Sequence, residues 1–121
     1  MVKTFLIIGG ILAFLSVVLG AFAAHALKSK LTPDRLAVFQ TGVQYQMYHA
    51  LALLLAGMLA DRSATLLVTA GWFFIIGIIL FSGSLYALAA SGIRKLGAIT
   101  PLGGLAFLIG WLLLVIQAIS L

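Results

Sequence analysis

Four apolar stretches dominate this chain, and each is close to the ~20 residues that a helix needs to cross the hydrocarbon core of a bilayer. They cover residues 4–27, 41–60, 65–90 and 100–120, so only short polar segments remain between them. A segment exposed to lipid must satisfy its backbone hydrogen bonds internally, and stretches of this length do so as helices. The sequence therefore predicts one domain, residues 1–121, that is an all-α integral membrane four-helix bundle.

The composition agrees with a membrane protein and excludes several other classes. Hydrophobic side chains make up 64% of the residues and charged ones only 7%, whereas a soluble domain carries about 25% charged residues. The formal net charge of +5 comes from lysines and arginines scattered at the ends of the apolar stretches, so we expect no nucleic-acid partner. The absence of cysteine from the sequence excludes disulfides and thiolate-ligated metals within it.

The segment before the second apolar stretch carries signals for the start of a helix. Thr32 is a good N-cap, Pro33 suits the first turn, and Asp34 favours the positive end of the helix dipole. A helix that continues from there through the second stretch would be about 42 Å long, more than the ~30 Å hydrocarbon core. We expect its amphipathic start, residues 33–41, to lie along the membrane surface with a bend at Gly42. A tilted, projecting helix is the alternative.

The run from Phe39 to His49 contains three of the four glutamines and two of the three tyrosines of the protein. On a helix, several of them fall within about half of the circumference, and the opposite side is apolar. A polar face at membrane depth needs protein partners or water. Together with the histidine near the end of the first stretch, this face is the candidate polar cluster or ligand-binding site: Gln40, Thr41, Gln44, Tyr45, Tyr48, His49 and His25.

Small residues recur every three or four positions in three of the stretches, which predicts faces on which a neighbouring helix can lie closely. They are Gly9, Ala13, Ser16, Gly20 and Ala24 in the first stretch, Gly83, Ala87 and Ser91 in the third, and Gly103, Ala106 and Gly110 in the fourth.

A weak internal repeat relates the two halves of the chain. At an offset of 66 residues Ser16 aligns with Ser82, and the Thr-Pro pair at 32–33 recurs at 100–101, where it predicts the start of the last helix. Two tandem helical hairpins related by a pseudo-twofold axis along the membrane normal would explain this repeat. Chance alignment of alanine-rich helices is the alternative. The polar run has no counterpart in the second half, so the polar cluster is asymmetric.

The basic residues predict the orientation in the membrane. The loops at 28–35 and 91–99 hold five of the seven lysines and arginines, whereas Lys3 and Arg62 are the other two. By the positive-inside rule, these two loops face the cytoplasm and both termini face outward.

Three motifs resemble a known family, and together they extend over nearly the whole chain. They read G-A-F-A-A-H-A-L at 20–27, F-Q-T-G-V-Q-Y-Q-M-Y-H continuing into A-L-A-L-L at 39–54, and T-P-L-G-G at 100–104. In these motifs the chain resembles the YgdD/YwdK-like family of small four-span membrane proteins. The resemblance implies a four-helix fold in the bacterial inner membrane. It implies no activity, because the family is a domain of unknown function.

The candidate residues do not suggest a metal centre or an active site. His49 is expected about 12 Å below the membrane surface and His25 near it, so we expect no shared metal ion, haem or other cofactor. The serines have only these histidines as bases, and Asp34 and Asp61 fall at opposite boundaries, so no catalytic constellation emerges. His49 is then either a hydrogen-bonded residue of the bundle or a residue that contacts a ligand or handles a proton.

Two functions follow from these expectations. The first is a non-enzymatic helical bundle with a binding, assembly or membrane-organising role, whose partners are membrane lipids, a second copy or another membrane protein. The second is an oligomeric transporter or channel for a small polar solute, in which the Gln/Tyr/His face lines a cavity with Ser82, Ser84 and Tyr86. They differ in whether the polar groups contact one another or line an open space.

Overall fold

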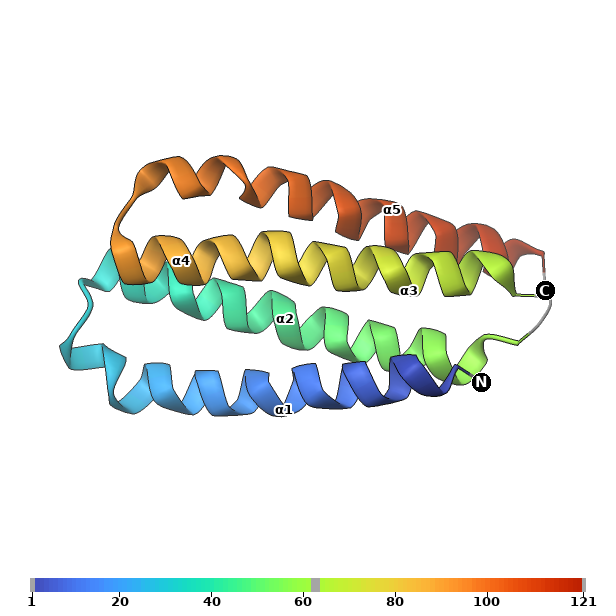
Figure 1. The fold of residues 1–121 in the computed structure, drawn as a ribbon, viewed down its shortest axis with the longest axis horizontal. Helices are drawn as coiled ribbons and strands as arrows, with labels where there is room; N and C mark the ends of the chain where they lie inside the picture. Colours follow the sequence, from blue (N-terminus) through green and yellow to red (C-terminus); the bar gives the residue numbers. More distant parts are fainter. Residues whose placement is uncertain (1, 62–63, 121) are drawn as a thin grey trace.

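A computed structural model describes residues 2–61 and 64–120, and this part of the chain forms four helical rods that lie side by side (Figure 1). The third rod is composite, because a π-helix joins two α-helices. The elements are α1 (Lys3–His25), the 3₁₀-helix η1 (Leu27–Ser29), α2 (Pro33–Leu59), α3 (Thr65–Gly77), the π-helix η2 (Ile78–Ser82), α4 (Gly83–Ser91), the 3₁₀-helix η3 (Arg94–Ala98) and α5 (Thr100–Ile119).

Neighbouring rods run antiparallel, and the two central ones hold the bundle together. α1 packs mainly on α2, α5 packs mainly on α3 and η2, and α2 lies against α3, η2 and α4 (Figure 1). The bundle is therefore two hairpins placed side by side, in agreement with the predicted all-α architecture. The internal repeat that suggested this arrangement stays a prediction.

Three helical segments are long and apolar enough to cross a membrane: Lys3–His25, Thr65–Ser91 and Arg94–Ile119. α2 contains 27 residues, which makes it about 40 Å long, and it lies alongside these three segments (Figure 1). Among the described residues, α2 does not meet the hydropathy expected of a membrane-spanning helix, because the polar run lowers its mean hydropathy. The predicted membrane bundle is confirmed, and the crossing of the membrane by residues 41–60 stays a prediction.

The start of α2 matches the sequence signals, and the helix is continuous at Gly42, where a bend was expected. The hydroxyl of Thr32 accepts a hydrogen bond from the backbone N–H of Arg35 at 3.3 Å, as an N-cap does. The helix then continues without interruption through Gly42. A Cβ at Gly42 would lie 2.8 Å from the ring of Tyr86, so this glycine permits close packing of α2 on α4. The position of residues 33–41 along the membrane surface stays a prediction.

The small-residue face of α5 packs as predicted, and that of α1 does so in part, since Ala24 is exposed and its neighbour Ala23 is buried instead. On α1, a Cβ at Gly9 would meet Leu54 of α2 at 2.9 Å, and Ser16 is buried. On α5, Gly103 is so close to the third rod that a Cβ would lie 2.3 Å from the backbone nitrogen of Phe81. Ala106 of the same face is also buried.

The third small-residue face was predicted wrongly. Ala87 is exposed, and no atom lies within 4 Å of a Cβ placed on Gly83. The buried residues of this part of the rod are instead Ser82, Ser84, Leu85 and Ala89. The three predicted residues all belong to α4 and share one face of it, but the residues that pack against the neighbouring helices lie on another face, and spacing alone does not show which face is buried.

The second Thr-Pro pair marks the start of the last helix, as predicted, but its threonine does not cap that helix. The N-cap position of α5 is Ile99, which makes no side-chain capping bond, and Thr100 belongs to the helix itself. The Thr100 hydroxyl lies 2.6 Å from the Ser84 hydroxyl of α4. It therefore links two helices, whereas Thr32 caps one.

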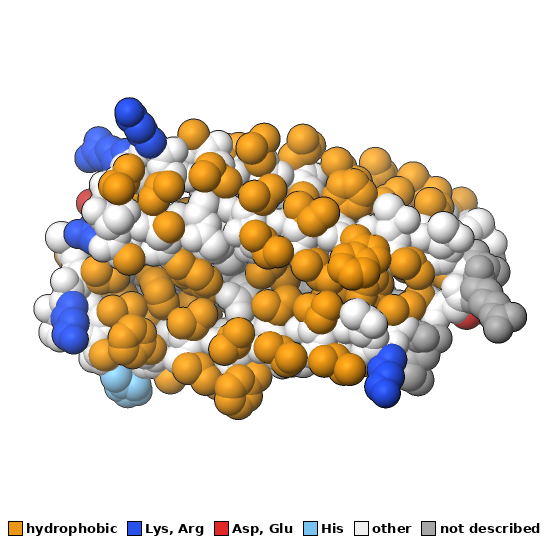
Figure 2. Space-filling model, in the orientation of Figure 1, with side chains coloured by type: hydrophobic (Ala, Val, Ile, Leu, Met, Phe, Trp, Pro, Cys, Tyr) orange, Lys and Arg blue, Asp and Glu red, His pale blue; other side chains and the backbone are white. Residues whose placement is uncertain are grey.

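The charged and apolar side chains are segregated along the long axis of the bundle. Hydrophobic side chains cover the middle of the face shown in Figure 2, and basic side chains gather at the end where α1 joins α2 and α4 joins α5. The loops at 28–35 and 91–99 thus share one end, as the predicted topology requires. The side of the membrane that they face stays a prediction. Arg62, which was counted for the opposite side, lies outside the described residues.

Candidate functional site

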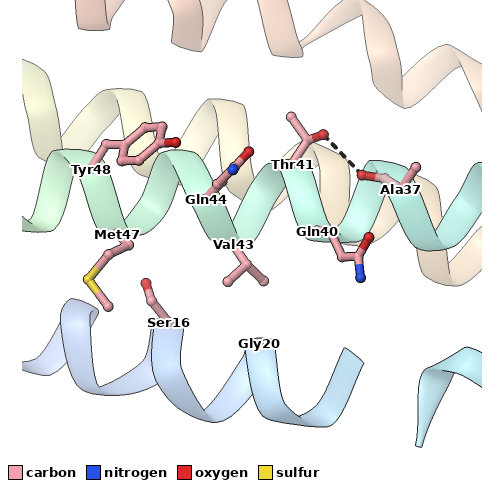
Figure 3. Close-up of a pocket in the computed structure, with 9 residues that line it drawn as sticks. All are labelled: Ser16, Gly20, Ala37, Gln40, Thr41, Val43, Gln44, Met47 and Tyr48. Carbon is pink, nitrogen blue, oxygen red and sulfur yellow. Dashed lines mark hydrogen bonds between the residues drawn. The ribbon is translucent and has the colours of Figure 1, made fainter. Parts of the chain in front are cut away.

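The polar run of α2 is divided among three surroundings, because successive side chains point in directions 100° apart around a helix. Gln46 points into the bundle, while Tyr45 and His49 face α5. The other predicted residues of the run line an outer groove between α1 and α2: Gln40, Thr41, Gln44 and Tyr48 (Figure 3). The predicted polar face is therefore not a single site.

The outer groove, called the lateral groove below, has a volume of about 690 Å³. Gln40 points toward α1, while Gln44 and Tyr48 lie along the opposite rim (Figure 3). Its complete lining is Ser16 and Gly20 of α1 with Ala37, Gln40, Thr41, Val43, Gln44, Met47 and Tyr48 of α2.

The polar groups of the lateral groove are mostly unpaired within the protein. Thr41 donates its hydroxyl proton to the carbonyl of Ala37 at 3.0 Å. The side chains of Gln40, Gln44 and Tyr48 are exposed, and across residues 2–61 and 64–120 they make no hydrogen bond to the chain. Two amides and a phenol are thus presented on the outside of the bundle.

The lateral groove extends to the middle depth of the bundle. Ser16, which forms part of its lining, lies about 13 Å from the His25 end of α1 and about 20 Å from the Lys3 end. Because α1 is one of the segments apolar enough to cross a membrane, we expect Gln44 and Met47 on the facing helix to lie at hydrocarbon depth. Polar groups at that depth need hydrogen-bond partners.

Gln46 occupies the interior of the bundle, and both the nitrogen and the oxygen of its side-chain amide are hydrogen-bonded. Its side chain is 3% exposed, its Nε2 donates to the carbonyl of Leu12 at 2.9 Å, and its Oε1 accepts from the Tyr86 hydroxyl at 2.5 Å. One turn away, the Ser82 hydroxyl donates to the carbonyl of Gly42 at 2.7 Å. These bonds join α1, α2 and the third rod. Sequence analysis missed Gln46, although a lone glutamine on the apolar side of α2 was the available signal.

His49 is 5% exposed, and both of its ring nitrogens are occupied. Nδ1 lies 2.8 Å from the carbonyl oxygen of Tyr45, and the indole N–H of Trp111 donates to Nε2 at 3.0 Å. A carbonyl only accepts and an indole only donates, so the histidine is the neutral Nδ1–H tautomer. Its ring stacks on Phe107 with centroids 3.5 Å apart. This geometry leaves no free lone pair for a metal ion, and nothing in the sequence pattern pointed to Trp111 as the partner.

A second groove, called the aromatic groove below, lies between α2 and α5 and has a volume of about 620 Å³. Tyr45 is 37% exposed at its edge and packs on Phe81 with ring centroids 4.6 Å apart. The rest of its lining is His49, Pro101, Gly104, Leu105, Phe107, Leu108 and Trp111. The aromatic groove is therefore largely apolar.

The structure separates His25 from the rest of the predicted cluster. His25 is exposed at the last turn of α1, whereas His49 lies in the interior near the middle of α2. Within the described ranges, no three His, Asp or Glu side chains come together as a possible metal site. Asp34 begins α2 and Asp61 follows its end, so the two carboxylates lie at opposite ends of the bundle.

Arg35 connects the two hairpins at the basic end. Its Nε donates to the carbonyl of Ala89 and its Nη2 to that of Ala90, each at 2.7 Å. These carbonyls belong to the last turn of α4, where unpaired acceptors and the negative end of the helix dipole favour a cation. Sequence analysis gave Arg35 only a topological role, because nothing local links it to a helix 54 residues away.

Comparisons with known proteins agree with the resemblance found in the motifs. The family described as a protein of unknown function, DUF423, matches residues 19–104. The chain is 52% identical over 120 residues to the UPF0382 membrane protein YwdK of Bacillus subtilis, and the alignment covers 98% of each chain. It is 46% identical over 115 residues to the UPF0382 membrane protein SH2409 of Staphylococcus haemolyticus, covering 95% of this chain and 94% of the relative.

No solved structure matches the chain. The relatives are named only as membrane proteins, so they add no ligand, partner or reaction to the geometry described above. The extent of both matches nevertheless determines the family, and the chain belongs to the DUF423 family of membrane proteins of unknown function.

Proposed function

We propose that this protein is a non-enzymatic assembly protein of the bacterial inner membrane that binds another transmembrane segment through its lateral groove. The observation that carries the proposal is the unpaired state of Gln40, Gln44 and Tyr48 on the outer side of α2. At this depth, lipid tails offer these groups no hydrogen bond. A transmembrane partner supplies the missing bonds.

The expected strength of such binding is modest for each contact. Hydrogen bonds between transmembrane helices contribute about 0.6 to 2 kcal/mol each, and close packing supplies the remainder. The floor of the groove favours close packing because Ser16, Gly20 and Ala37 are small. A partner helix thus meets a smooth floor with polar groups along its rim.

Transport of a small polar solute has less support from the geometry. Gln44 and Tyr48 belong to the lateral groove, whereas Tyr45 and His49 belong to the aromatic groove. Ser82 donates to Gly42, and Ser84 is paired with Thr100. The polar groups therefore do not converge on one lining.

Topology completes the proposal. The loops at 28–35 and 91–99 are assigned to the cytoplasm, and both termini to the outside, because five basic residues cluster at the first end. The lateral groove then extends from the cytoplasmic end of α2 toward the centre of the bilayer.

Crosslinking from the groove tests the proposed function. The sequence contains no cysteine, so a single Gln44→Cys variant carrying a benzophenone maleimide reports on one position in native membranes. The matched control is Leu108→Cys on α5, a position that is 68% exposed. We expect protein adducts from position 44 and lipid adducts alone from position 108. Lipid adducts alone from both positions, or labelling of Gln44→Cys by a water-soluble maleimide in intact vesicles, would contradict lateral binding.

A further inference from the structure

We propose, on the basis of the lateral binding described above, that the occupant of the lateral groove is a second copy of this chain. In this dimer the two α2 helices are parallel, and Gln44 of one copy hydrogen-bonds Gln44 of the other. The twofold axis runs along the membrane normal.

The chemistry of the amide makes this surface complementary to itself. A glutamine side chain carries both a donor NH₂ and an acceptor carbonyl, so two glutamines satisfy each other reciprocally. A twofold interface brings the same patch of both copies together. When the axis is parallel to the membrane normal, each residue also meets its equivalent at the same depth. Gln44 therefore finds a polar partner without any further adaptation.

The groove also has the shape that a helix pair needs. Gln40, Gln44 and Tyr48 are four residues apart, so they form one stripe that is about 12 Å long along α2. The small side chains of Gly20 and Ala37 leave space beside that stripe. Small residues beside hydrogen-bonding side chains are the usual composition of a transmembrane helix interface.

Other occupants fit these features less well. An acyl chain fills space but cannot bond the amides, and lipid head groups lie near the surface, away from the mid-depth position of Gln44. A different protein would need its own polar side chains at the same depth. A second copy has them by symmetry, which is the reason to favour it.

Disulfide crosslinking tests the dimer and its direction. In a parallel dimer, cysteines at positions 40, 44 and 48 each link to the same position of the second copy. In an antiparallel dimer, position 40 of one copy faces position 48 of the other, because these residues lie four positions on either side of Gln44. The variants are Gln40→Cys, Gln44→Cys and Tyr48→Cys, oxidised singly and as the mixture of the first and third in native membranes.

We expect each single variant to form a covalent dimer and the mixture to form no additional 40-to-48 product, which mass spectrometry of the crosslinked peptides detects. Leu108→Cys, exposed on α5, is the control for random collisions and should crosslink at least fivefold less. A 40-to-48 product, or equal crosslinking at position 108, would overturn the parallel dimer.

A second measurement does not depend on introduced cysteines. Single-molecule photobleaching in dilute vesicles gives the dimer fraction of the native chain, and Gln44→Leu should weaken the association by about 3- to 30-fold, equivalent to 0.6 to 2 kcal/mol. The matched control is Gln117→Leu, the same change near the end of α5 and outside the lateral groove, which should leave the dimer fraction unchanged. A native chain that is monomeric at every density overturns the dimer.

The two proposals fail in different ways. If Gln44 crosslinks to a different membrane protein and never to itself, the dimer is wrong and lateral binding stands. If position 44 contacts only lipid or water, both are wrong.

Discussion

The two sides of α2 carry similar polar side chains, but those on one side are hydrogen-bonded within the chain and most of those on the other side are not. On the side that faces the third rod and α5, Gln46 and His49 are buried and every polar atom of their side chains has a partner. On the outer side, Gln40 and Gln44 are exposed and make no bond within residues 2–61 and 64–120. The inner groups join the helices of one chain, while the outer groups are available to something else.

This difference shows why polarity alone does not identify a functional residue in a membrane bundle. A buried polar group that is fully bonded specifies how the helices align, because any other alignment leaves it unpaired. A polar group that the chain leaves unpaired at membrane depth indicates a missing partner. His49, the most conspicuous polar residue of the sequence, belongs to the first kind.

The largest effect is expected from His49→Ala. The change removes a ring that stacks on Phe107 and leaves the indole N–H of Trp111 without its acceptor. Loss of ring contacts and of the bond should lower the free energy of unfolding by about 3 kcal/mol. SDS-induced unfolding in mixed micelles, followed by circular dichroism, measures this change.

Trp111→Phe is the matched control for the histidine. It keeps a smaller aromatic ring in the aromatic groove and removes the donor, so it should cost about 1 kcal/mol. If His49→Ala leaves the unfolding free energy unchanged, the structural role assigned to the inner side of α2 is wrong.

A somewhat smaller effect is expected from Gln46→Leu. This change leaves the hydroxyl of Tyr86 without its acceptor and removes the bond to the carbonyl of Leu12. The free energy of unfolding should fall by about 1 to 3 kcal/mol in the same assay. The double variant with Tyr86→Phe should be less destabilised than the sum of the two single variants, because both partners of the bond are then removed together. Strict additivity would show that the two side chains do not interact.

Arg35→Lys tests a third kind of polar group on α2, one that is partly exposed and yet hydrogen-bonded within the chain. Lysine keeps the charge but cannot bond the carbonyls of Ala89 and Ala90 with a fork of two donors. We expect a loss of about 1 kcal/mol and faster hydrogen exchange in the last turn of α4. Unchanged exchange there would indicate that the arginine does not secure the end of α4.

Much of the fold followed from the sequence, because hydrophobic length and helix-start signals are local properties. The four apolar stretches predicted the four rods, and Thr32 predicted the start of α2. The face of the third rod could not be predicted in the same way, since spacing shows which residues of α4 share a face but not which face meets the other helices. The role of Gly42 could not be predicted either. The glycine permits close packing against the ring of Tyr86, which is far away in the sequence.

The candidate site was predicted as a stretch but not as an arrangement. Counting at 100° per residue correctly grouped Gln40, Gln44 and Tyr48. It could not separate them from His49, because that distinction depends on where α5 and its Trp111 pack. Partners that are far apart in the chain set the boundary between the inner and outer sides of α2.

The smallest effect on the single chain is expected from Gln44→Leu, and it is the most informative for the comparison between the two sides. The exposed amide has no partner within the described residues, so its loss should change the unfolding free energy of the monomer by no more than about 0.5 kcal/mol. The measurement requires detergent concentrations at which the chain is monomeric.

A loss as large as that of Gln46→Leu would mean that Gln44 also supports the fold. A neutral result combined with weaker association in vesicles would separate the two sides of α2 into one that builds the bundle and one that binds.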